Sequence, residues 1–434
     1  MQTVNWTQVS KSDRQQALSR PDTLSDPKIA RNVENILAMV RDNGDSALKD
    51  LTLKFDGIVL SSLSVPMSDC EAAWNGLQDD DRQAMQMAKR NIEAFHLAQK
   101  PTAISVETMP GVVCRREPRA LDSAGLYVPA GTAPLVSTLM MLAIPAKLAG
   151  VPRCVVTTPP AKDGKVDRFV LAAAYLCGVD EIYSVGGAQA VAALAFGTDS
   201  IAKVAKIFGP GNAYVATAKA SVSQYPGGPA IDLPAGPSEA MVLADDQANP
   251  VFVASDLLSQ AEHDTMAQVV CVCRSQNFAD RLLAEIEKQV SDLPRRKTAR
   301  ASLENGRILV VDDENDMIEI VNQYAPEHLI VQITKPETIV PRIQNAGSIF
   351  LGPWTPESVG DYASGTNHTL PTNGAARAYS GVVLESFVKY ISVQQLSRSG
   401  LEALGPSVER LANMEGLEAH RRAVSLRLNN GEPS

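Results

Sequence analysis

Four polar side chains in the second half of this chain have the chemistry of metal ligands. In the segment LSQAEHD, Gln260 and His263 are three residues apart at the end of a predicted helix, so both lie on one face of that helix. Asp361 lies on a predicted glycine-rich loop, SVGDYASGTNH, and His420 lies on a predicted C-terminal helix. Two imidazoles, a carboxylate and an amide oxygen suit a borderline metal such as zinc. The spacing equally allows hydrogen-bonded structural histidines and a turn-forming Asp361.

A second group, the consecutive residues Glu327 and His328 in YAPEHL, has the chemistry of a general acid/base couple. The two residues stand between a predicted helix and a predicted strand. Neighbours in an extended chain point to opposite sides, so the backbone must turn if both are to reach one substrate. Pro326, directly before them, permits such a turn.

Three further ionisable residues are His368, Glu415 and His96. His368 lies on the same glycine-rich segment as the candidate aspartate ligand, and Glu415 precedes His420 by five residues. One continuous helix would not direct Glu415 and His420 to one point, so Gly416 is expected to break or begin a helix between them. His96, on a long helical stretch, is expected to be an ordinary surface or packing residue.

Three glycine-containing loops follow predicted strands and lead into predicted helices: YVPAGTAP (127–134), VGGAQA (185–190) and FGPGNAY (208–214). Glycine lets backbone N–H groups approach a phosphate closely, and helix N-termini favour anions. None of the loops is a GxGxxG motif or a P-loop, so each alone is also explained as a tight turn without a ligand. Three such loops on one sheet favour a nucleotide site.

The segments that must position these residues alternate between strands and helices. Strands are predicted at 124–128, 153–157, 181–185 and 204–207, with helices at 134–149, 166–178, 187–197 and 212–223. A second series has strands at 239–244, 267–273, 307–312, 329–334 and 348–351, with helices at 249–263, 276–292, 315–324 and 335–345. This alternation predicts two doubly wound, mostly parallel α/β halves, 120–236 and 237–380.

The remaining segments carry weaker signals. Residues 1–25 are polar and turn-rich, which predicts an arm or short helices. Amphipathic helices within 27–100 are expected to pack on the second half, which would make the first half an insertion. A hairpin is predicted from 104–107 and 112–116, and the chain beyond 383 is predicted to be helical without a further strand.

Composition limits the possible partners. With 40 basic and 49 acidic side chains, a net charge of −9 and a pI near 5.2, the chain is not expected to bind nucleic acid or an anionic membrane. The most apolar stretch, 135–150, is too short to span a bilayer, and the N-terminus lacks a signal-peptide pattern. The six cysteines form no CxxC pair, and Cys271 and Cys273 fit a buried strand. These features predict a reduced, cytoplasmic protein.

Several long segments resemble the histidinol dehydrogenase family. The family signature is similar to IDLPAGPSEAMVLADDQANPVFVASDLLSQAEHD, and the similarity extends to GLYVPAG, VGGAQAVAALAFGT, KIFGPGNAYV, YAPEHL, AGSIFLGPWTPESVGDYASGTNHTLPT and EAHRRAVSLR. The similarity extends from about residue 25 to about residue 430. Ala130 stands where the family commonly has a second glycine, which weakens the assignment of that loop to a cofactor, and Ala240 replaces a larger aliphatic residue.

The resemblance implies a zinc- and NAD-dependent homodimer that oxidises L-histidinol to L-histidine through L-histidinal, the last steps of histidine biosynthesis. Its implied zinc ligands are Gln260, His263, Asp361 and, from the other subunit, His420. Its implied acid/base residues are Glu327 and His328. Implied substrate contacts are Ser238, Gln260, His263, His328, Asp361, His368, Glu415 and His420. Implied NAD contacts are Tyr127, Gln189 and Asn212, one on each of the three loops.

The fold class that follows is α/β, with two Rossmann-like, doubly wound and mostly parallel domains, a small N-terminal arm and a helical C-terminal domain. The expected domains are 1–25 for the arm, 26–119 with 237–382 for the zinc and acid/base residues, 120–236 for the inserted NAD loops, and 383–434 for the helical domain that reaches the partner's site.

Three other functions fit parts of the pattern. A zinc hydrolase would use Glu327 to activate water, but it leaves the cofactor-like loops unexplained. A non-catalytic nucleotide-binding oligomer would need no zinc. A related zinc and NAD dehydrogenase of another small polar alcohol is the closest alternative, and Glu415 together with His420 favours an imidazole-bearing amino alcohol over it.

Overall fold

The computed structural model describes residues 1–21, 26–130, 134–234 and 236–429. The chain forms two compact units, each built from two stretches of sequence. The larger unit comprises Met1–Gln99 and Leu121–Phe387, and the smaller unit comprises Lys100–Ala120 and the residues from Val388 onward. Residues 131–133 of the YVPAGTAP segment and residue 235 of the IDLPAGPSE segment lie outside the described residues.

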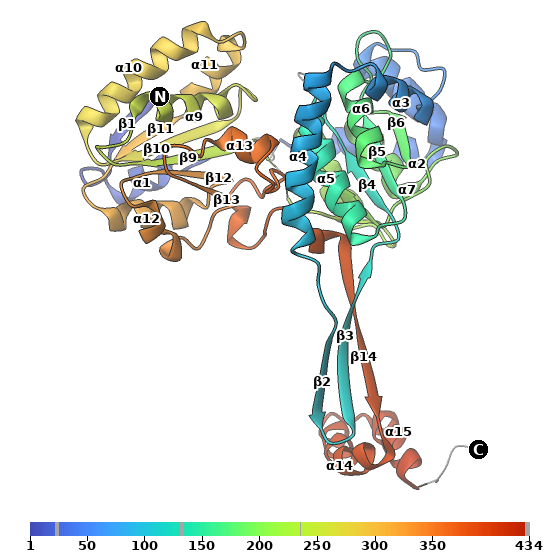
Figure 1. Ribbon diagram of the computed structural model, residues 1–434. Coiled ribbons are helices and arrows are strands. Elements are labelled where there is room, and N and C mark those ends of the chain that lie inside the picture. Colours follow the sequence, from blue (N-terminus) through green and yellow to red (C-terminus); the bar gives the residue numbers. More distant parts are fainter. Residues whose placement is uncertain (22–25, 131–133, 235, 430–434) are drawn as a thin grey trace. The chain divides into compact units, whose positions relative to one another are not determined.

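A six-stranded parallel sheet in the larger unit carries the predicted acid/base residues (Figure 1). Its strand order is β1 (Gln2–Asn5), β11 (Arg307–Val310), β10 (Gln268–Cys273), β9 (Glu239–Ala244), β12 (His328–Gln332) and β13 (Ser348–Leu351). Alternate residues of β9 face opposite layers: Ala240 and Val242 pack with α9 (Pro250–Ala261), α10 (Gln276–Asp292) and α11 (Arg296–Asn305), whereas Met241 and Leu243 pack with α1 (Lys11–Ala17) and α12 (Glu314–Tyr324). Burial on both faces explains why β9 and β10 are almost continuously apolar.

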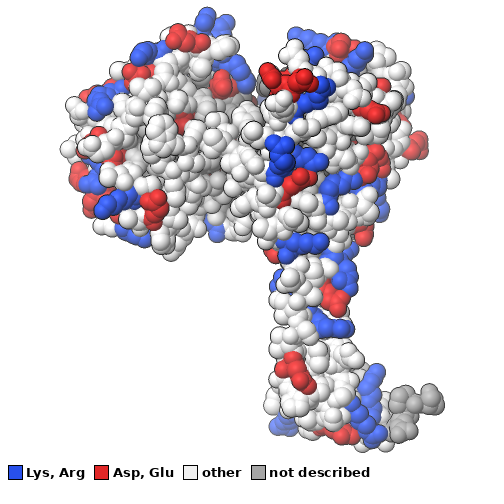
Figure 2. Space-filling view, in the orientation of Figure 1, with Lys and Arg blue, Asp and Glu red and all other residues white. Residues whose placement is uncertain are grey.

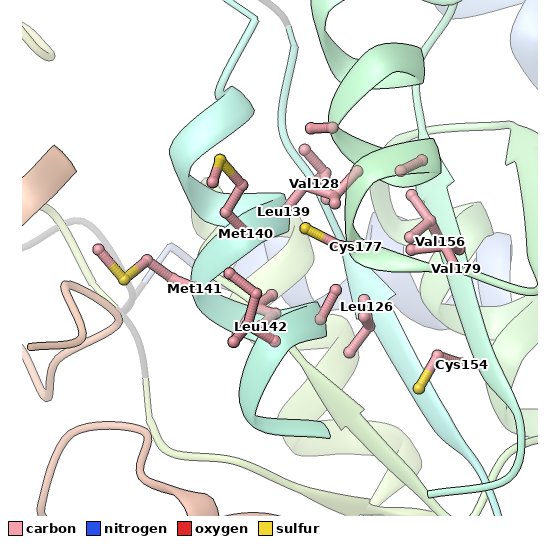
Figure 3. Close-up of a cluster of buried hydrophobic side chains, with 14 of the residues drawn as sticks. Leu126, Val128, Leu139, Met140, Met141, Leu142, Cys154, Val156, Cys177 and Val179 are labelled. Atoms are coloured by element: carbon pink, nitrogen blue, oxygen red, sulfur yellow. The ribbon is translucent and has the colours of Figure 1, made fainter. Parts of the chain in front are cut away.

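The second parallel sheet of the larger unit has the order β6 (Glu181–Ser184), β5 (Cys154–Thr158), β4 (Ala124–Tyr127), β7 (Lys206–Phe208) and β8 (Ala230–Ile231). The helices after these strands are α5 (Val136–Ala149), α6 (Arg168–Cys177), α7 (Gly187–Phe196) and α8 (Ala213–Val222). Leu126 and Val156 pack with Leu139 and Cys177 in one apolar core (Figure 3). The predicted α/β class with two parallel sheets is confirmed.

The early helices pack differently from the prediction. They are α2 (Pro27–Asp56), α3 (Met67–Asn75) and α4 (Asp79–Leu97). Leu37 and Leu48 of α2 share a core with Val191 of α7, and Cys70 of α3 packs in the core that contains Leu139. These helices therefore cover the five-stranded sheet, and the prediction that they pack on the second half is wrong. An amphipathic pattern identifies a face that must be buried but not the surface that buries it.

Other differences concern short elements. The N-terminal residues form the short helix α1, one of the two predicted alternatives, and in addition β1, which joins the edge of the six-stranded sheet. The helix predicted at 335–345 is replaced by two 3-10 turns, η1 (Pro336–Thr338) and η2 (Val340–Arg342). Three further short elements are α13 (Glu357–Tyr362), η3 (Ala375–Arg377) and η4 (Leu384–Phe387).

The smaller unit is an antiparallel sheet followed by two helices (Figure 1). The predicted hairpin is present as β2 (Ile104–Met109) and β3 (Val112–Ala120), and β3 also pairs along its whole length with β14 (Val388–Leu396). The prediction that no strand follows residue 383 is therefore wrong. The helical prediction holds for α14 (Arg398–Met414) and α15 (Glu418–Asn429), which Gly416 separates with a φ of +71°.

All six cysteines are free thiols, and Cys114 on β3 is the one that is not fully buried. Burial raises the pKa of Cys70 to about 11 and the pKa values of Cys154 and Cys177 to about 12. Lys and Arg side chains are interspersed with Asp and Glu on the face shown in Figure 2. None of the helices in the described ranges combines the length and apolar character needed to cross a membrane.

A buried ion pair holds the third glycine loop to the sheet. Lys219 of α8 pairs with Asp232, and their side chains are 2% and 1% exposed. Lys219 Nζ also donates to the carbonyl of Gly209 at 2.8 Å, while the N–H of Gly209 donates to Asp232 Oδ2 at 2.7 Å. The peptide groups on both sides of Gly209 are thus fixed by one pair of charges.

We expect Lys219→Met to lower the free energy of unfolding by about 3–5 kcal/mol, because it leaves a buried carboxylate without its counter-charge. Urea denaturation would measure the change. The double variant Lys219→Met/Asp232→Asn should lose less than Lys219→Met, and Lys203→Met at an exposed position serves as the control. Equal stability of Lys219→Met and the wild type would contradict the expectation.

Candidate active site

Glu327 and His328 meet at the amino end of β12, where the chain turns sharply out of α12. Ala325 adopts a left-handed φ of +56° at the end of the helix, which provides the turn that the sequence required. Both residues are buried, at 5% and 4% exposure. Glu327 Oε2 lies 3.7 Å from His328 Nδ1, so the two side chains meet instead of pointing apart.

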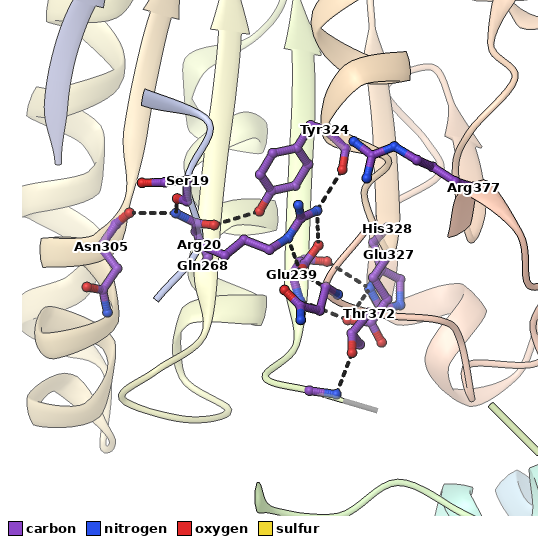
Figure 4. Close-up of polar contacts among 12 residues, drawn as sticks. Ser19, Arg20, Glu239, Gln268, Asn305, Tyr324, Glu327, His328, Thr372 and Arg377 are labelled. Atoms are coloured by element: carbon purple, nitrogen blue, oxygen red, sulfur yellow. Dashed lines mark hydrogen bonds and ion pairs between the residues drawn. The ribbon is translucent and has the colours of Figure 1, made fainter. Parts of the chain in front are cut away.

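The neighbouring strand β9 holds both side chains (Figure 4). The N–H of Glu239 donates to Glu327 Oε2 at 2.8 Å, and His328 Nδ1 lies 3.2 Å from the carbonyl oxygen of Glu239. This contact follows from the sheet, because His328 is paired in register with Ala240. The pair thus lies at the amino ends of its strands, although ligands of parallel α/β sheets usually bind at the carboxyl ends.

The short helix α13 brings two carboxylates to the same place. Asp361 lies on this helix and not, as predicted, on a loop, and its Oδ1 is 3.5 Å from His328 Nε2. Glu357, one helical turn earlier, is 1% exposed, and both its carboxylate oxygens are buried without a hydrogen-bond partner among the described residues. Ligand atoms of His328, Glu357 and Asp361 all lie within 4.8 Å of one another, a spacing that could hold a metal ion.

Helix α9 supplies the remaining candidate ligands of the larger unit and contacts α13. Gln260 is buried near its end, and Gln260 Oε1 has no hydrogen-bond partner in the described part of the chain. His263 follows the helix and is exposed, and its N–H donates to the carbonyl of Gln260 at 3.2 Å. A buried amide oxygen without a donor is an acceptor left available for a ligand such as a metal ion.

Electrostatic effects in this cluster are large because it is buried. Burial raises the pKa of Glu327 to about 7, despite the opposing charge of His328. Burial would lower the pKa of His328, but Glu357, Glu327 and Asp361 together raise it well above its ordinary value. Burial raises the pKa of Glu357 well above its usual range. The pKa of Asp361 is lowered, because the hydrogen bond and charge of His328 outweigh its burial.

His368 connects α13 to the helix α5 of the other sheet. Its Nδ1 is 2.8 Å from the carbonyl oxygen of Asp361, and its Nε2 is 3.2 Å from Thr138 Oγ1. Both ring nitrogens therefore have partners within the chain. Burial lowers the pKa of His368, against the raising effect of the Asp361 charge.

The three residues predicted to contact a dinucleotide lie at the carboxyl ends of their strands. Tyr127 ends β4, Gln189 is buried on α7 after β6, and Asn212 is the N-cap of α8 after β7. The N–H of Gly187 donates to Tyr127 Oη at 3.1 Å. Gly209 lies against the carbonyl of Tyr127 with a φ of +119°, and a Cβ there would be only 2.1 Å from that oxygen.

The strand order places these loops at a topological switch point. From β4 the chain continues to β5 and β6 on one side, and it then returns to β7 on the other side of β4. Doubly wound sheets bind nucleotides beyond the carboxyl ends of the strands at such a point. Tyr127 ends β4, and Asn212 follows β7.

The remaining predicted site residues are Ser238, Glu415 and His420. Ser238, half-buried, directly precedes β9, and its carbonyl accepts the N–H of Gln268 at 3.1 Å. Glu415 ends α14, and His420 lies on α15, and both are exposed on the smaller unit. Glu357 is the residue that the sequence reading missed. Its position four residues before Asp361, which puts both on one helical face, was the available signal.

Two doubly wound parallel sheets with glycine turns at a switch point are typical of nucleotide-binding enzymes, a class that includes the dehydrogenases. Comparison with known proteins identifies the enzyme family. The family model for histidinol dehydrogenase matches residues 19–428. The chain therefore belongs to the histidinol dehydrogenase family of NAD-dependent oxidoreductases, which catalyses the last steps of histidine biosynthesis, and the resemblance seen in the sequence is confirmed.

Individual relatives agree over almost the whole length. The chain is 48% identical to the histidinol dehydrogenase of Yersinia pestis over 98% of this chain and 95% of that protein, and 48% identical to that of Escherichia coli (strain K12) over 98% and 97%. It spans about half, 52%, of a putative histidine biosynthesis bifunctional protein from Photorhabdus laumondii. The crystal structure of histidinol dehydrogenase from Elizabethkingia anophelis is similar, with a TM-score of 0.94, 44% identity and coverage of 99% and 98%.

Proposed function

We propose that the protein oxidises L-histidinol to L-histidine through L-histidinal, with NAD as the hydride acceptor in both steps and one zinc ion in each active site. The observation that carries this proposal is the buried Glu327–His328 pair facing Asp361, with His328 Nε2 3.5 Å from Asp361 Oδ1. It is supported by membership in the family over residues 19–428.

The donor set around α9 and α13 fits zinc. Gln260, His263 and Asp361 would supply an amide oxygen, an imidazole nitrogen and a carboxylate oxygen. The unpartnered Gln260 Oε1 supports this set. Bound zinc would act as a template for the imidazole and amine of histidinol. The cluster of His328, Glu357 and Asp361 is a second arrangement of ligand atoms, but it would occupy the imidazole that the reaction needs as a base.

The fourth zinc ligand, His420, would come from a second copy of the chain. Among the described residues of the smaller unit, Val112 and Ala412 are the buried hydrophobic side chains. Large hydrophobic side chains are exposed on the same unit: Ile104, Val106, Ile391, Leu396, Leu411, Met414, Leu417 and Leu426. So much exposed apolar surface favours a protein partner. A homodimer with shared active sites would cover it and bring His420 and Glu415 to the site.

The acid/base residues divide the two oxidation steps between them. In its neutral form, which its raised pKa makes available only at higher pH, His328 would take the proton of the substrate hydroxyl as hydride leaves for NAD. Glu327 activates the water that hydrates the aldehyde, and its pKa of about 7 lets it accept a proton near neutral pH. Ser238, His368 and Glu415 would contact the substrate with the ligand side chains.

The NAD site is proposed at the switch point of the five-stranded sheet. Tyr127, Gln189 and Asn212 would contact the cofactor from the loops after β4, β6 and β7. The N-termini of α7 and α8 supply the positive ends of helix dipoles, and the N–H groups of Tyr214 and Val215 in the first turn of α8 are capped by the Asn212 side chain. Ala130, on the first of these loops, replaces a glycine of the family pattern, so its backbone is expected to adapt less freely.

The direct test is the number of NADH molecules formed for each histidinol consumed. A four-electron oxidation gives about two, because each NAD accepts one hydride and two electrons. Absorbance at the NADH band, with histidinol limiting, measures this ratio. A ratio of one would favour the alternative of a related zinc and NAD dehydrogenase of another small polar alcohol. No NADH would favour a hydrolase or a nucleotide-binding protein.

We expect Glu327→Gln to slow oxidation of histidinal by about 10²- to 10⁴-fold and oxidation of histidinol to histidinal by much less. In the wild type the rate with histidinal should rise with pH until it levels off above about 7, since Glu327 must be ionised to act as the base. The variant should lose this rise. Equal losses in both half-reactions, with histidinal supplied directly, would contradict the assigned role.

A mixed-dimer experiment tests the shared site. Neither His263→Ala nor His420→Ala should be active alone. Chains of the two kinds, unfolded together and reassembled, should regain about a quarter of the wild-type activity, because half of the dimers then contain one intact site of two. Each variant reassembled by itself is the control. Mixed dimers that form and stay inactive would place all four ligands on one chain.

A further inference from the structure

We propose that Arg20 and Glu239 form a positioning pair that holds Glu327 and His328 in their reactive geometry. The inference rests on the proposed function of Glu327 and His328. It assigns a role in the reaction to the N-terminal segment, whose Arg20 is far in sequence from every other residue of the site.

The pair itself is a buried, bidentate ion pair (Figure 4). Arg20 Nε lies 2.6 Å from Glu239 Oε1, and Arg20 Nη2 lies 2.9 Å from Glu239 Oε2. The two side chains are 15% and 3% exposed. Such two-point contacts fix the orientation of a carboxylate as well as its charge.

Other contacts fix the Arg20 guanidinium in turn. It stacks on the ring of Tyr324, 3.8 Å from the ring centre, and Nη2 donates to the Tyr324 carbonyl at 2.7 Å. Tyr324 is the last residue of α12, three residues before Glu327. Glu239 Oε1 also accepts the N–H of Asn373 at 2.7 Å. The carboxylate is thus held by Arg20 and Asn373.

The main chain of Glu239 contacts both Glu327 and His328, so a fixed Glu239 also fixes these two side chains. The Glu239 N–H donates to Glu327 Oε2 at 2.8 Å, and its carbonyl oxygen lies 3.2 Å from His328 Nδ1. A carbonyl oxygen can only accept, so a hydrogen bond there places the proton of neutral His328 on Nδ1. Nε2 is then the nitrogen that can take a proton from substrate.

One residue therefore sets the direction of the Glu327 carboxylate and the tautomer of His328. Without Arg20 the buried Glu239 carboxylate would lose its counter-charge and draw in water or move. Any movement of the Glu239 peptide would displace both reactive groups. Displacements of about 1 Å can reduce rates about 100-fold.

The test uses Arg20→Met, Arg20→Lys and Glu239→Gln in the full-length enzyme. We expect kcat for histidinol oxidation to fall about 10- to 100-fold in Arg20→Met, with the KM for NAD unchanged, and to fall less in Arg20→Lys, which keeps the charge but not the planar two-point contact. The double variant Arg20→Met/Glu239→Gln should be no slower than the slower single variant, because both act through one contact.

A matched control exists in the other sheet. Arg153 and Glu181 make the same bidentate contact, with Nε to Oε1 at 2.6 Å and Nη2 to Oε2 at 2.9 Å, and neither belongs to the proposed site. Arg153→Met should change the unfolding midpoint without a comparable loss of kcat. Wild-type kcat in both Arg20 variants, or a loss in Arg153→Met as large as in Arg20→Met, would overturn the proposal.

Hydrogen exchange provides a readout that needs no activity. Mass spectrometry should show faster exchange at the Glu239 amide in Arg20→Met and no change there in Arg153→Met. Unchanged exchange at Glu239 would refute the positioning pair. If the wild type fails to oxidise histidinol, the proposed function is wrong, whereas exchange at Glu239 still decides whether Arg20 holds this peptide.

Discussion

The parallel pairing of β9 with β12 is the interaction on which the site depends. In this register His328 lies opposite Ala240, so the amide of Glu239 reaches the carboxylate of Glu327. The chain reaches this arrangement by forming β10 and β11 on one side of β9 and then crossing to β12 on the other. The helices α9 and α13 deliver polar groups to the same end of the sheet. A shift of β12 by one residue would send its buried side chains to the opposite face.

Much of the fold could be predicted because parallel strands buried on both faces form continuous apolar runs, as in QVVCVC of β10. The spacing of apolar residues in α2 could not show which surface this helix covers. An amphipathic helix reveals which of its own faces is buried but not which part of the protein buries it. The sequence pattern also missed β14, where polar and apolar residues follow each other in VKYISVQQL and the pairing partner β3 is far away in sequence. β1 is too short to be distinguished from a loop without β11 beside it.

The residues of the candidate site, like the fold, could be predicted from the sequence only in part. Residue type and the family resemblance identified Glu327, His328 and Asp361, and the structure brings these three together. The sequence placed Glu327 and His328 directly before a predicted strand, but it could not show that β9 and α13 bring Glu239 and Asp361 to the same end of the sheet. Arg20 carries no local signal, since an isolated arginine in a polar segment is usually solvated, and the signal for Glu357 was limited to its spacing of four residues from Asp361. The ligand and cofactor roles remain predictions that rest on the resemblance.

The distribution of the six thiols has a practical consequence. Five cysteines are buried inside the larger unit, away from reagents, and burial raises the pKa of Cys70, Cys154 and Cys177. Cys114 alone is half-buried, and it lies on β3 of the smaller unit. A maleimide fluorophore or spin label added to the unmodified protein would therefore report selectively from the smaller unit. In the proposed homodimer, the distance between the labels on the two Cys114 side chains would follow the smaller units without any engineered cysteine.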